Sequence, residues 1–280
     1  MKILITGIYG FLGFHLAHYL SKSNKVFGLY STTIKMGLEA VVPVFSSLDE
    51  IHFTPDVIVM CHAAVASGSH SIANDTLLAV NVDWTAKILD KFPLSKCIYI
   101  SSVSVYGEPM ETITEYSSVN PLSDYAKSKY IGEQIVMRNP RNSVIRFSSL
   151  YGAGMKAHTL LPIYCNQALR NKKIEVWGNG SRFQNYIHVS DAVALISKVV
   201  VFEDAIPFPV LGVFAKEYSN LQVAKVLAEA TDSEIVFINA DASKSFFYDN
   251  KISQKVLNWQ PKMTIEVGLK KYLEWKEKQS

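Results

Sequence analysis

The chain has 280 residues, of which 49% are hydrophobic, and its formal net charge is +3. This composition can bury a large core in one large domain or two modest ones. The charges are balanced and dispersed along the chain, so we do not expect a nucleic-acid-binding protein.

The three cysteines, Cys61, Cys97 and Cys165, are widely spaced and odd in number. They predict neither a disulfide framework nor a metal site, and they fit a reducing compartment. The N-terminal run MKILITG is too short for a signal peptide, and no apolar stretch approaches the ~18–20 residues that span a bilayer. We therefore expect a cytoplasmic protein without a membrane span.

The N-terminal segment has the pattern of a dinucleotide-binding turn. Residues 2–6 form a short apolar run that predicts a buried strand, and residues 14–23 have the pattern of an amphipathic helix. Between them lie Gly7, Gly10 and Gly13. Gly7 can make the tight turn, Gly10 lets a pyrophosphate approach the helix N-terminus, and Gly13 lets the helix pack closely on the strand. This strand–turn–helix context favours dinucleotide binding over simple tight packing.

The second predicted strand, residues 25–30, ends without the Asp or Glu that usually binds the ribose of NAD. Ser31 and Thr32 follow it, with Lys35 nearby. Small hydroxyls and a cation suit a 2′-phosphate, so the sequence favours NADP(H), while NAD(H) remains possible.

Apolar runs predict four more strands, and a helical spacing predicts a helix over 76–92. Six strands alternating with helices indicate an α/β protein with a parallel, doubly wound Rossmann sheet. Ala63 and Ala64 follow the fourth strand, and their small size leaves room for a cofactor at the sheet edge. We expect the neighbouring Cys61 and His62 to be packed residues. The four strands are residues 40–45, 56–61, 96–100 and 143–150.

The strongest candidates for catalysis are Tyr125 and Lys129, in the run DYAKSK. Residues four apart on a helix lie on one face, and Ser123 is a plausible N-cap for that helix. A phenol with a pKa of about 10 is a poor acid or base at neutral pH. A nearby ammonium lowers that pKa, so the phenol can exchange a proton with an alcohol or carbonyl. Ser102, at the end of the fifth strand, can donate a hydrogen bond to a substrate oxygen, or it can simply cap a turn.

Beyond residues 151–154 the pattern loosens into shorter elements. We predict helices at 159–170, 191–201 and 219–231, strands at 174–177, 185–189, 208–214 and 234–238, and two short C-terminal helices. Without a Pro-, Gly- or Ser-rich linker, this part is expected to be a smaller lobe folded back on the sheet. Residues 1–152 would form the dinucleotide-binding and catalytic domain. Residues 153–280 would mainly bind substrate, with segments returning to the first domain.

Taken together, these motifs resemble the extended short-chain dehydrogenase/reductases of the nucleotide-sugar epimerase/dehydratase type, over essentially the whole chain. The resemblance is carried by Gly7-x-x-Gly10-x-x-Gly13, His62-Ala63-Ala64, Asn81, Ser101-Ser102-x-x-Val105-Tyr106-Gly107, Tyr125-x-x-x-Lys129, Arg146…Tyr151-Gly152, Gly178-Asn179-Gly180…His188-Val189-Ser190-Asp191 and Leu257-Asn258-Trp259-Gln260-Pro261.

The resemblance implies a role for each matching residue. Tyr125 would donate or accept the proton, Ser102 would hold the reacting oxygen, and Lys129 would bind the nicotinamide ribose and lower the Tyr125 pKa. Phe11 and Leu12 would lie over the pyrophosphate. Asn81 would be structural. A homodimer would form through the helices near 76–92 and 123–138. The implied cofactor set comprises Gly7, Tyr9, Gly10, Phe11, Leu12, Gly13, Ser31, Thr32, Leu48, Ala63, Ala64, Tyr125 and Lys129.

Several positions depart from the family pattern. Val103 and Ser104 stand where sugar 4,6-dehydratases have the Asp-Glu acid and base, so a dehydratase is not expected.

The substrate side departs as well. The usual Arg-Asp pair is replaced by Gln184 and Asn185, which leaves Arg182 as a candidate for the diphosphate. Ser149 replaces a substrate-contacting Asn, and His158 is a candidate second acid/base or a loop residue without a role.

Three functions follow. The first is an NADPH-dependent reductase of an NDP-4-keto-6-deoxy sugar, favoured by the missing carboxylate after the second strand. The second is an NAD-retaining NDP-sugar 4-epimerase, which would use the same three residues. The third is a non-catalytic Rossmann protein that senses NADP(H).

Overall fold

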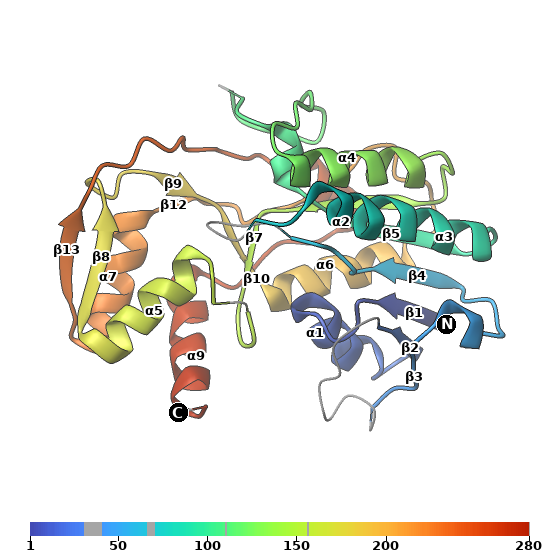
Figure 1. The fold of residues 1–280 in the computed structure, drawn as a ribbon, viewed down its shortest axis with the longest axis horizontal. Helices are drawn as coiled ribbons and strands as arrows, with labels where there is room; N and C mark the ends of the chain where they lie inside the picture. The colour runs from blue at the N-terminus through green and yellow to red at the C-terminus, as the bar shows by residue number, and fades with distance from the viewer. Residues whose placement is uncertain (31–40, 66–70, 110, 156, 280) are drawn as a thin grey trace.

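The computed structural model describes residues 1–30, 41–65, 71–109, 111–155 and 157–279. Its largest part is a parallel sheet with the strand order β11-β6-β5-β4-β1-β2-β3. A smaller lobe lies at one end of this sheet (Figure 1). The sheet strands are β1 (Lys2–Thr6), β2 (Lys25–Leu29), β3 (Val44–Phe45), β4 (Val57–Met60), β5 (Lys96–Ser102), β6 (Ser143–Phe147) and β11 (Val210–Gly212).

The Rossmann prediction is confirmed, with two differences in the strands. The sheet has seven strands instead of six, because β11 from the C-terminal half pairs with β6. Of the predicted strand 40–45, only Val44 and Phe45 pair in the sheet, and residue 40 lies outside the described residues. Pro43 precedes this short strand and has no N–H for a ladder, although its carbonyl still accepts from Gly28 N at 2.9 Å.

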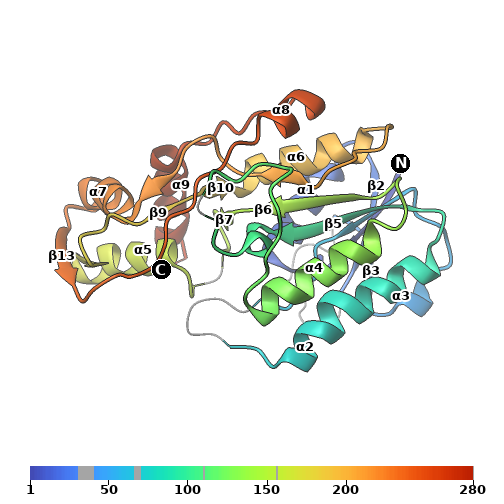
Figure 2. The same cartoon turned by 90° about the horizontal axis from the view of Figure 1, so that it is seen from above.

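Helices cover both faces of the sheet, as Figure 2 shows. On one face, α1 (Phe11–Leu20) and α6 (Val189–Val201) bury a large apolar cluster. On the other face, α3 (Trp84–Lys91) and α4 (Asp124–Val136) pack over a second cluster that includes Tyr99. The C-terminal ends of β1 and β4 point toward the lobe in Figure 1, and ligands bind at the C-terminal ends of the strands in open α/β sheets.

The helix predicted over 76–92 begins earlier and is not regular. It starts as α2 (Asn74–Leu78), widens into the π-helical turn η2 (Ala79–Asp83) and continues as α3. Asn81, in the π turn, is fully buried, and its amide hydrogen bonds to the main chain of Ala64. Such turns occur frequently at functional sites.

The smaller lobe has its own apolar core. Its strands β8 (Lys173–Trp177) and β13 (Glu234–Ile238) pair in parallel, and residues such as Val176, Leu227 and Leu269 fill the core between the elements. The helices of the lobe are α5 (Leu160–Asn171), α7 (Asn220–Thr231) and α9 (Ile265–Glu277).

Short strand pairs connect the lobe to the sheet. They are β7 (Ser149–Tyr151) with β10 (Tyr186–His188), and β9 (Phe183–Gln184) with β12 (Tyr218–Ser219). Near the C-terminus, α8 (Lys251–Leu257) returns to the sheet, and Trp259 is buried in the same cluster as α1 and α6. In the described part of the chain, no helix is long and apolar enough to span a bilayer.

Candidate active site

The glycine turn between β1 and α1 fits closely against the chain that follows β4. Gly7 has φ +63°, and a Cβ on it would lie 2.8 Å from His62 Cα. A Cβ on Gly13 would lie 2.5 Å from the Gly7 carbonyl oxygen. Helix α1 begins after Gly10, which has no side chain to cap the first turn. The first-turn amides therefore face a space that an anion such as a pyrophosphate can occupy.

The other predicted cofactor residues have different environments. Tyr9 and Leu12 are buried, whereas Ala63 is exposed. Phe11 is half-buried and packs edge-on against the His15 ring. Leu48 opens a short 3₁₀ turn, η1 (Leu48–Glu50), and its side chain is buried in the cluster on the α3–α4 face. Ser31 and Thr32 lie outside the described residues.

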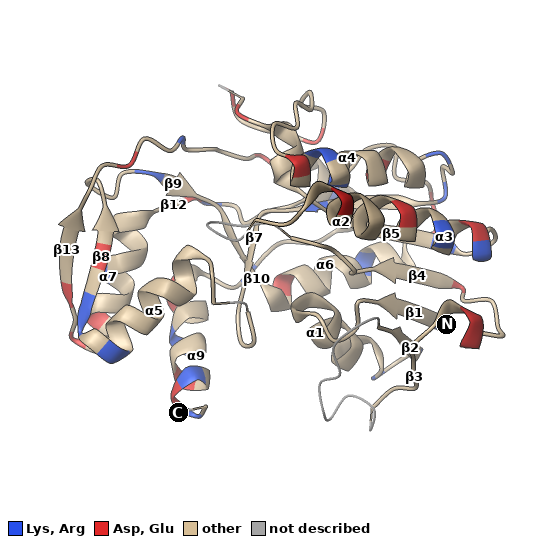
Figure 3. Cartoon of the chain, viewed as in Figure 1, with Lys and Arg blue, Asp and Glu red and all other residues tan. Residues whose placement is uncertain are grey.

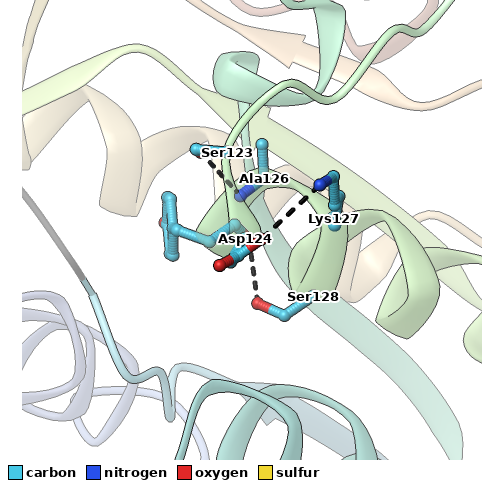
Figure 4. Close-up of polar contacts among 6 residues, drawn as sticks. Ser123, Asp124, Ala126, Lys127 and Ser128 are labelled. Carbon is cyan, nitrogen blue, oxygen red and sulfur yellow. Dashed lines mark hydrogen bonds and ion pairs between the residues drawn. The ribbon is translucent and has the colours of Figure 1, made fainter. Parts of the chain in front are cut away.

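Helix α4 is the element that carries Tyr125 and Lys129. Ser123 caps it as predicted, because its Oγ accepts from Ala126 N at 3.2 Å (Figure 4). Lys127 pairs with Asp124 on the exposed side of the helix at 3.5 Å. Tyr125 and Lys129 lie on the inner side, toward the sheet edge, with Tyr125 half-buried and Lys129 buried.

Ser102 ends β5 and touches both the following turn and Tyr125. Its Oγ accepts from Ser104 N at 3.1 Å, which caps the short turn η3 (Val103–Tyr106). A hydrogen bond from Ser102 also lowers the pKa of Tyr125, but burial outweighs it and raises that pKa to about 12. Lys129 is not among the groups that shift this pKa, so the expected lowering of the Tyr125 pKa by Lys129 stays a prediction.

Lys129 is a buried cation without a hydrogen bond. Its side chain is 1% exposed, and Nζ has no hydrogen-bond partner among the described residues. Burial lowers its pKa to about 7, while Glu133 and Cys61 act in the opposite direction. The Glu133 carboxylate is already paired with Arg146, at 3.0 Å and 2.6 Å. A buried Nζ without a hydrogen-bond partner among the described residues fits a dinucleotide, whose ribose hydroxyls would accept the missing hydrogen bonds.

A chain of buried polar groups supports this site, and most of it was not predicted. His62 Nδ1 lies 2.6 Å from Thr6 Oγ1, and His62 Nε2 lies 3.1 Å from Thr85 Oγ1. Asn81 Nδ2 donates to Ser128 Oγ at 2.9 Å, and that hydroxyl donates to the Tyr125 carbonyl at 2.8 Å. The motifs in the sequence had pointed to His62 and Asn81, whereas Thr6, Thr85 and Ser128 were not predicted.

Of the two residues expected to be packed, His62 is buried, and its pKa is lowered to about 3 by burial and by Lys129, so it is neutral. Cys61 is half-buried and packs against the apolar cluster of α1 and α6, as expected, and it interacts electrostatically with Lys129. The end of β4 therefore contributes to the wall of the candidate site.

The candidate substrate residues come from three separate segments. Ser149 is exposed in β7, and His158 is exposed just before α5. Arg182 Nε donates to the Lys244 carbonyl at 3.3 Å.

The residues in place of the Arg-Asp pair make structural contacts. Gln184 donates to Asn220 Oδ1 at 2.8 Å, and the buried Asn185 donates to the Phe214 carbonyl at 2.8 Å. Neither carries a positive charge toward a substrate phosphate.

A family model, described as the NAD dependent epimerase/dehydratase family, matches residues 3–208. The chain belongs to this family. This membership was expected from the motifs in the sequence.

Relatives of this family align over nearly the full chain. A putative UDP-glucose 4-epimerase of Methanocaldococcus jannaschii is 24% identical, over 98% of this chain and 97% of the relative. Two solved structures share the fold at 20% identity. One is the UDP-glucuronic acid 4-epimerase of Bacillus cereus in complex with UDP-glucuronic acid and NAD, with a TM-score of 0.87 and complete coverage of both chains. The other is the UDP-glucose 4-epimerase of Thermotoga maritima with UDP-glucose, with a TM-score of 0.88 over 100% of this chain and 99% of that one.

Proposed function

We propose that the chain is an NAD-dependent nucleotide-sugar 4-epimerase. The observation that carries this proposal is the hydrogen bond between Ser102 and Tyr125, with Lys129 one turn further along α4 and no carboxylate at the two positions after Ser102. The relatives support the epimerase over the reductase, because 4-epimerases are among them and one binds NAD.

Tyr125 and Ser102 have different roles at the C4 oxygen of the sugar. Bound NAD supplies the hydride acceptor and donor. Tyr125 takes the proton from the C4 hydroxyl and later returns it, and Ser102 hydrogen bonds to the same oxygen in both stages. Lys129 donates to the ribose hydroxyls. Burial raises the Tyr125 pKa to about 12, so the phenol is protonated at neutral pH. A bound cofactor and substrate would have to lower this pKa before Tyr125 could accept the C4 proton.

Loss of water from the sugar is not expected. The dehydratase acid and base would have to act from positions 103 and 104. Val103 has no ionisable group, and the Ser104 hydroxyl is buried without a partner in the described part of the chain. Neither side chain can exchange a proton at neutral pH.

An NADPH-dependent reductase of an NDP-4-keto-6-deoxy sugar is the second candidate. It is favoured by the absence of a carboxylate between Tyr30 and Lys35, where Ser31 and Thr32 suit a 2′-phosphate. The same Ser102, Tyr125 and Lys129 would polarise the C4 carbonyl and protonate the developing alkoxide.

The two candidates differ in how the cofactor is used, and one experiment separates them. The purified protein is denatured, and released NAD(H) and NADP(H) are quantified by chromatography. The native protein is then incubated with UDP-glucose and UDP-glucuronic acid without added cofactor, and the C4 epimers are resolved by proton NMR. We expect retained NAD(H) and conversion to the epimer.

A parallel assay follows NADPH absorbance with UDP-, dTDP-, GDP- and CDP-linked 4-keto-6-deoxy sugars. If the protein consumes NADPH and releases no bound cofactor on denaturation, the reductase proposal replaces the epimerase proposal. No turnover in either assay would count against both.

A further inference from the structure

Tyr99 lies directly beneath the buried Lys129. It belongs to β5, between β4 and β6, and its side chain is fully buried. Lys129 Nζ lies 4.0 Å from the centroid of the Tyr99 ring. Since Nζ has no hydrogen-bond partner among the described residues, this ring face is the contact that receives the positive charge. A desolvated ammonium over an aromatic face is attracted by the negative charge density of the ring.

The position of the Tyr99 ring is fixed from several sides. The phenol hydroxyl donates to the Asn81 carbonyl at 3.0 Å, inside the π turn η2. Helix α4 can pass close above the ring because residue 132 is glycine. A Cβ there would lie 2.3 Å from the Tyr99 hydroxyl and 2.8 Å from the Asn81 carbonyl oxygen. Strand β5, the π turn and α4 therefore fix the position of the Tyr99 ring, and the ring stays against Lys129.

We propose that Tyr99 is a positioning residue, whose ring face holds the Lys129 ammonium in the charged form and directed at the cofactor ribose. The orientation of Lys129 toward the cofactor rests on the proposed function, whereas the contact between Tyr99 and Lys129 is part of the chain's own fold. Glu133 also favours the charged form of Lys129, but both oxygens of its carboxylate accept hydrogen bonds from Arg146, so it is not a hydrogen-bond partner of Nζ.

Fluorination of the ring tests the proposal without changing its shape. Residue 99 is replaced by Phe, 4-fluoro-Phe, 3,5-difluoro-Phe and 3,4,5-trifluoro-Phe through nonsense suppression. Each fluorine withdraws electron density from the ring face, whereas packing changes little. The Lys129 pKa is followed by NMR of ¹³C-lysine-labelled, ligand-free protein, and Lys129→Met assigns the resonance.

We expect Tyr99→Phe to leave the Lys129 pKa nearly unchanged, because the ring remains. The trifluoro ring should lower it by about one unit, with intermediate values between. Tyr99→Leu should lower it at least as far. If the pKa does not depend on fluorination, the proposal is overturned, and Tyr99 is only a core residue.

Tyr151→Leu is the matched control for Tyr99→Leu. Tyr151 is also fully buried, donates to a main-chain carbonyl, that of Thr264, and lies against a glycine, Gly268. We expect this variant to lose stability without moving the Lys129 pKa.

Cofactor affinity is the second readout. It is measured by the fluorescence of titrated NADH across the fluorinated series, and the dissociation constant should rise up to about tenfold as the Lys129 pKa falls below the assay pH. If the affinity for NADH is unchanged although the Lys129 pKa has shifted, Tyr99 influences Lys129 but not cofactor binding, and its proposed role toward the cofactor is overturned. Because the pKa series uses no substrate, a failed epimerase assay would leave the result on Lys129 intact.

Discussion

Lys129 combines a positive charge with an almost complete loss of hydration, and this should cost stability. Its pKa is about 7 in the folded chain against an ordinary 10.5. Between these values the unfolded chain binds a proton that the folded chain does not. The free energy of unfolding therefore falls as the pH decreases from 10.5 to 7, and the penalty is constant below that window.

Replacing Lys129 by Met should remove this penalty. We expect a free energy of unfolding at pH 7 that is higher by on the order of a few kcal/mol, and a smaller rise between pH 7 and 10. Urea unfolding at several pH values measures both quantities. Lys127→Met, on the exposed side of α4, should show neither change. If Lys129→Met has a lower free energy of unfolding than wild type at pH 7, the contacts of Lys129 outweigh its loss of hydration, and the prediction is wrong.

Tyr125→Phe should lower turnover by roughly 10²–10⁴-fold, because a positioned proton donor and acceptor is lost. The melting temperature and the affinity for NADH should remain close to wild type, since the ring is kept. Tyr130→Phe, on the same helix, serves as the control in the epimer assay. If Tyr125→Phe turns over substrate as fast as wild type, the Tyr125 hydroxyl does not take part in the reaction.

Cys61 provides a chemical probe of the site wall. It is half-buried, whereas Cys97 and Cys165 are fully buried, so iodoacetamide should label Cys61 first. Burial raises the pKa of this thiol to about 12, and the labelling rate should therefore rise roughly tenfold per pH unit above neutrality. Mass spectrometry follows the modified peptide, with Cys61→Ser as the blank. Saturating NADH should protect the thiol, and labelling of Cys97 before Cys61 would contradict the burial described.

Among the elements, α4 depends most on a close approach to its neighbours. Gly132→Ala would place a Cβ 2.3 Å from the Tyr99 hydroxyl, and the fixed ring cannot yield. We expect a loss of about 1–3 kcal/mol in the free energy of unfolding, together with weaker NADH binding. Chemical denaturation and the NADH titration measure these effects. Lys127→Ala, on the exposed side of the same helix, should change stability by at most about 0.5 kcal/mol. A Gly132→Ala protein as stable as wild type would mean that β5 and α4 can separate.

Elements whose signal is local were predictable from the sequence. The strand expected at 234–238 matches β13, and the Ser123 cap is present. The π turn was missed because it depends on Asn81 bonding to Ala64, 17 residues earlier in the chain. In the candidate site, Tyr125 and Lys129 share one motif and were predicted together, and their catalytic role stays a prediction. Tyr99, Thr6 and Thr85 were not, because their contacts join segments that only the fold brings together.

Across the whole molecule, Lys and Arg residues are interspersed with Asp and Glu, as Figure 3 shows for α3, α4 and α9. Over the described residues, this mixture of charges leaves no extended field of one sign to attract a polyanion. A second copy of the chain is the partner that we propose, through α2–α3 and α4. On and near α4, Ile131 and Leu122 are 40% and 55% exposed, which suits a contact between copies.

Ile131→Asp should convert such a dimer into monomers. A charge at an apolar interface loses its hydration without gaining a partner. Sedimentation velocity measures the mass. Val267→Asp, at a 49% exposed position on α9, should leave it unchanged. A monomeric wild-type protein at micromolar concentration would exclude this association.

The late return of the chain to the sheet has a consequence for synthesis on the ribosome. The outermost strand, Val210–Gly212, and the indole of Trp259 complete layers that the first half begins. The nascent N-terminal half therefore emerges with an open strand edge until Val210–Gly212 is made, and with an incompletely covered apolar face until Trp259 is made. A fragment ending at residue 152 should aggregate when produced alone, and a stalled ribosome should hold a protease-sensitive intermediate until Trp259 has left the exit tunnel.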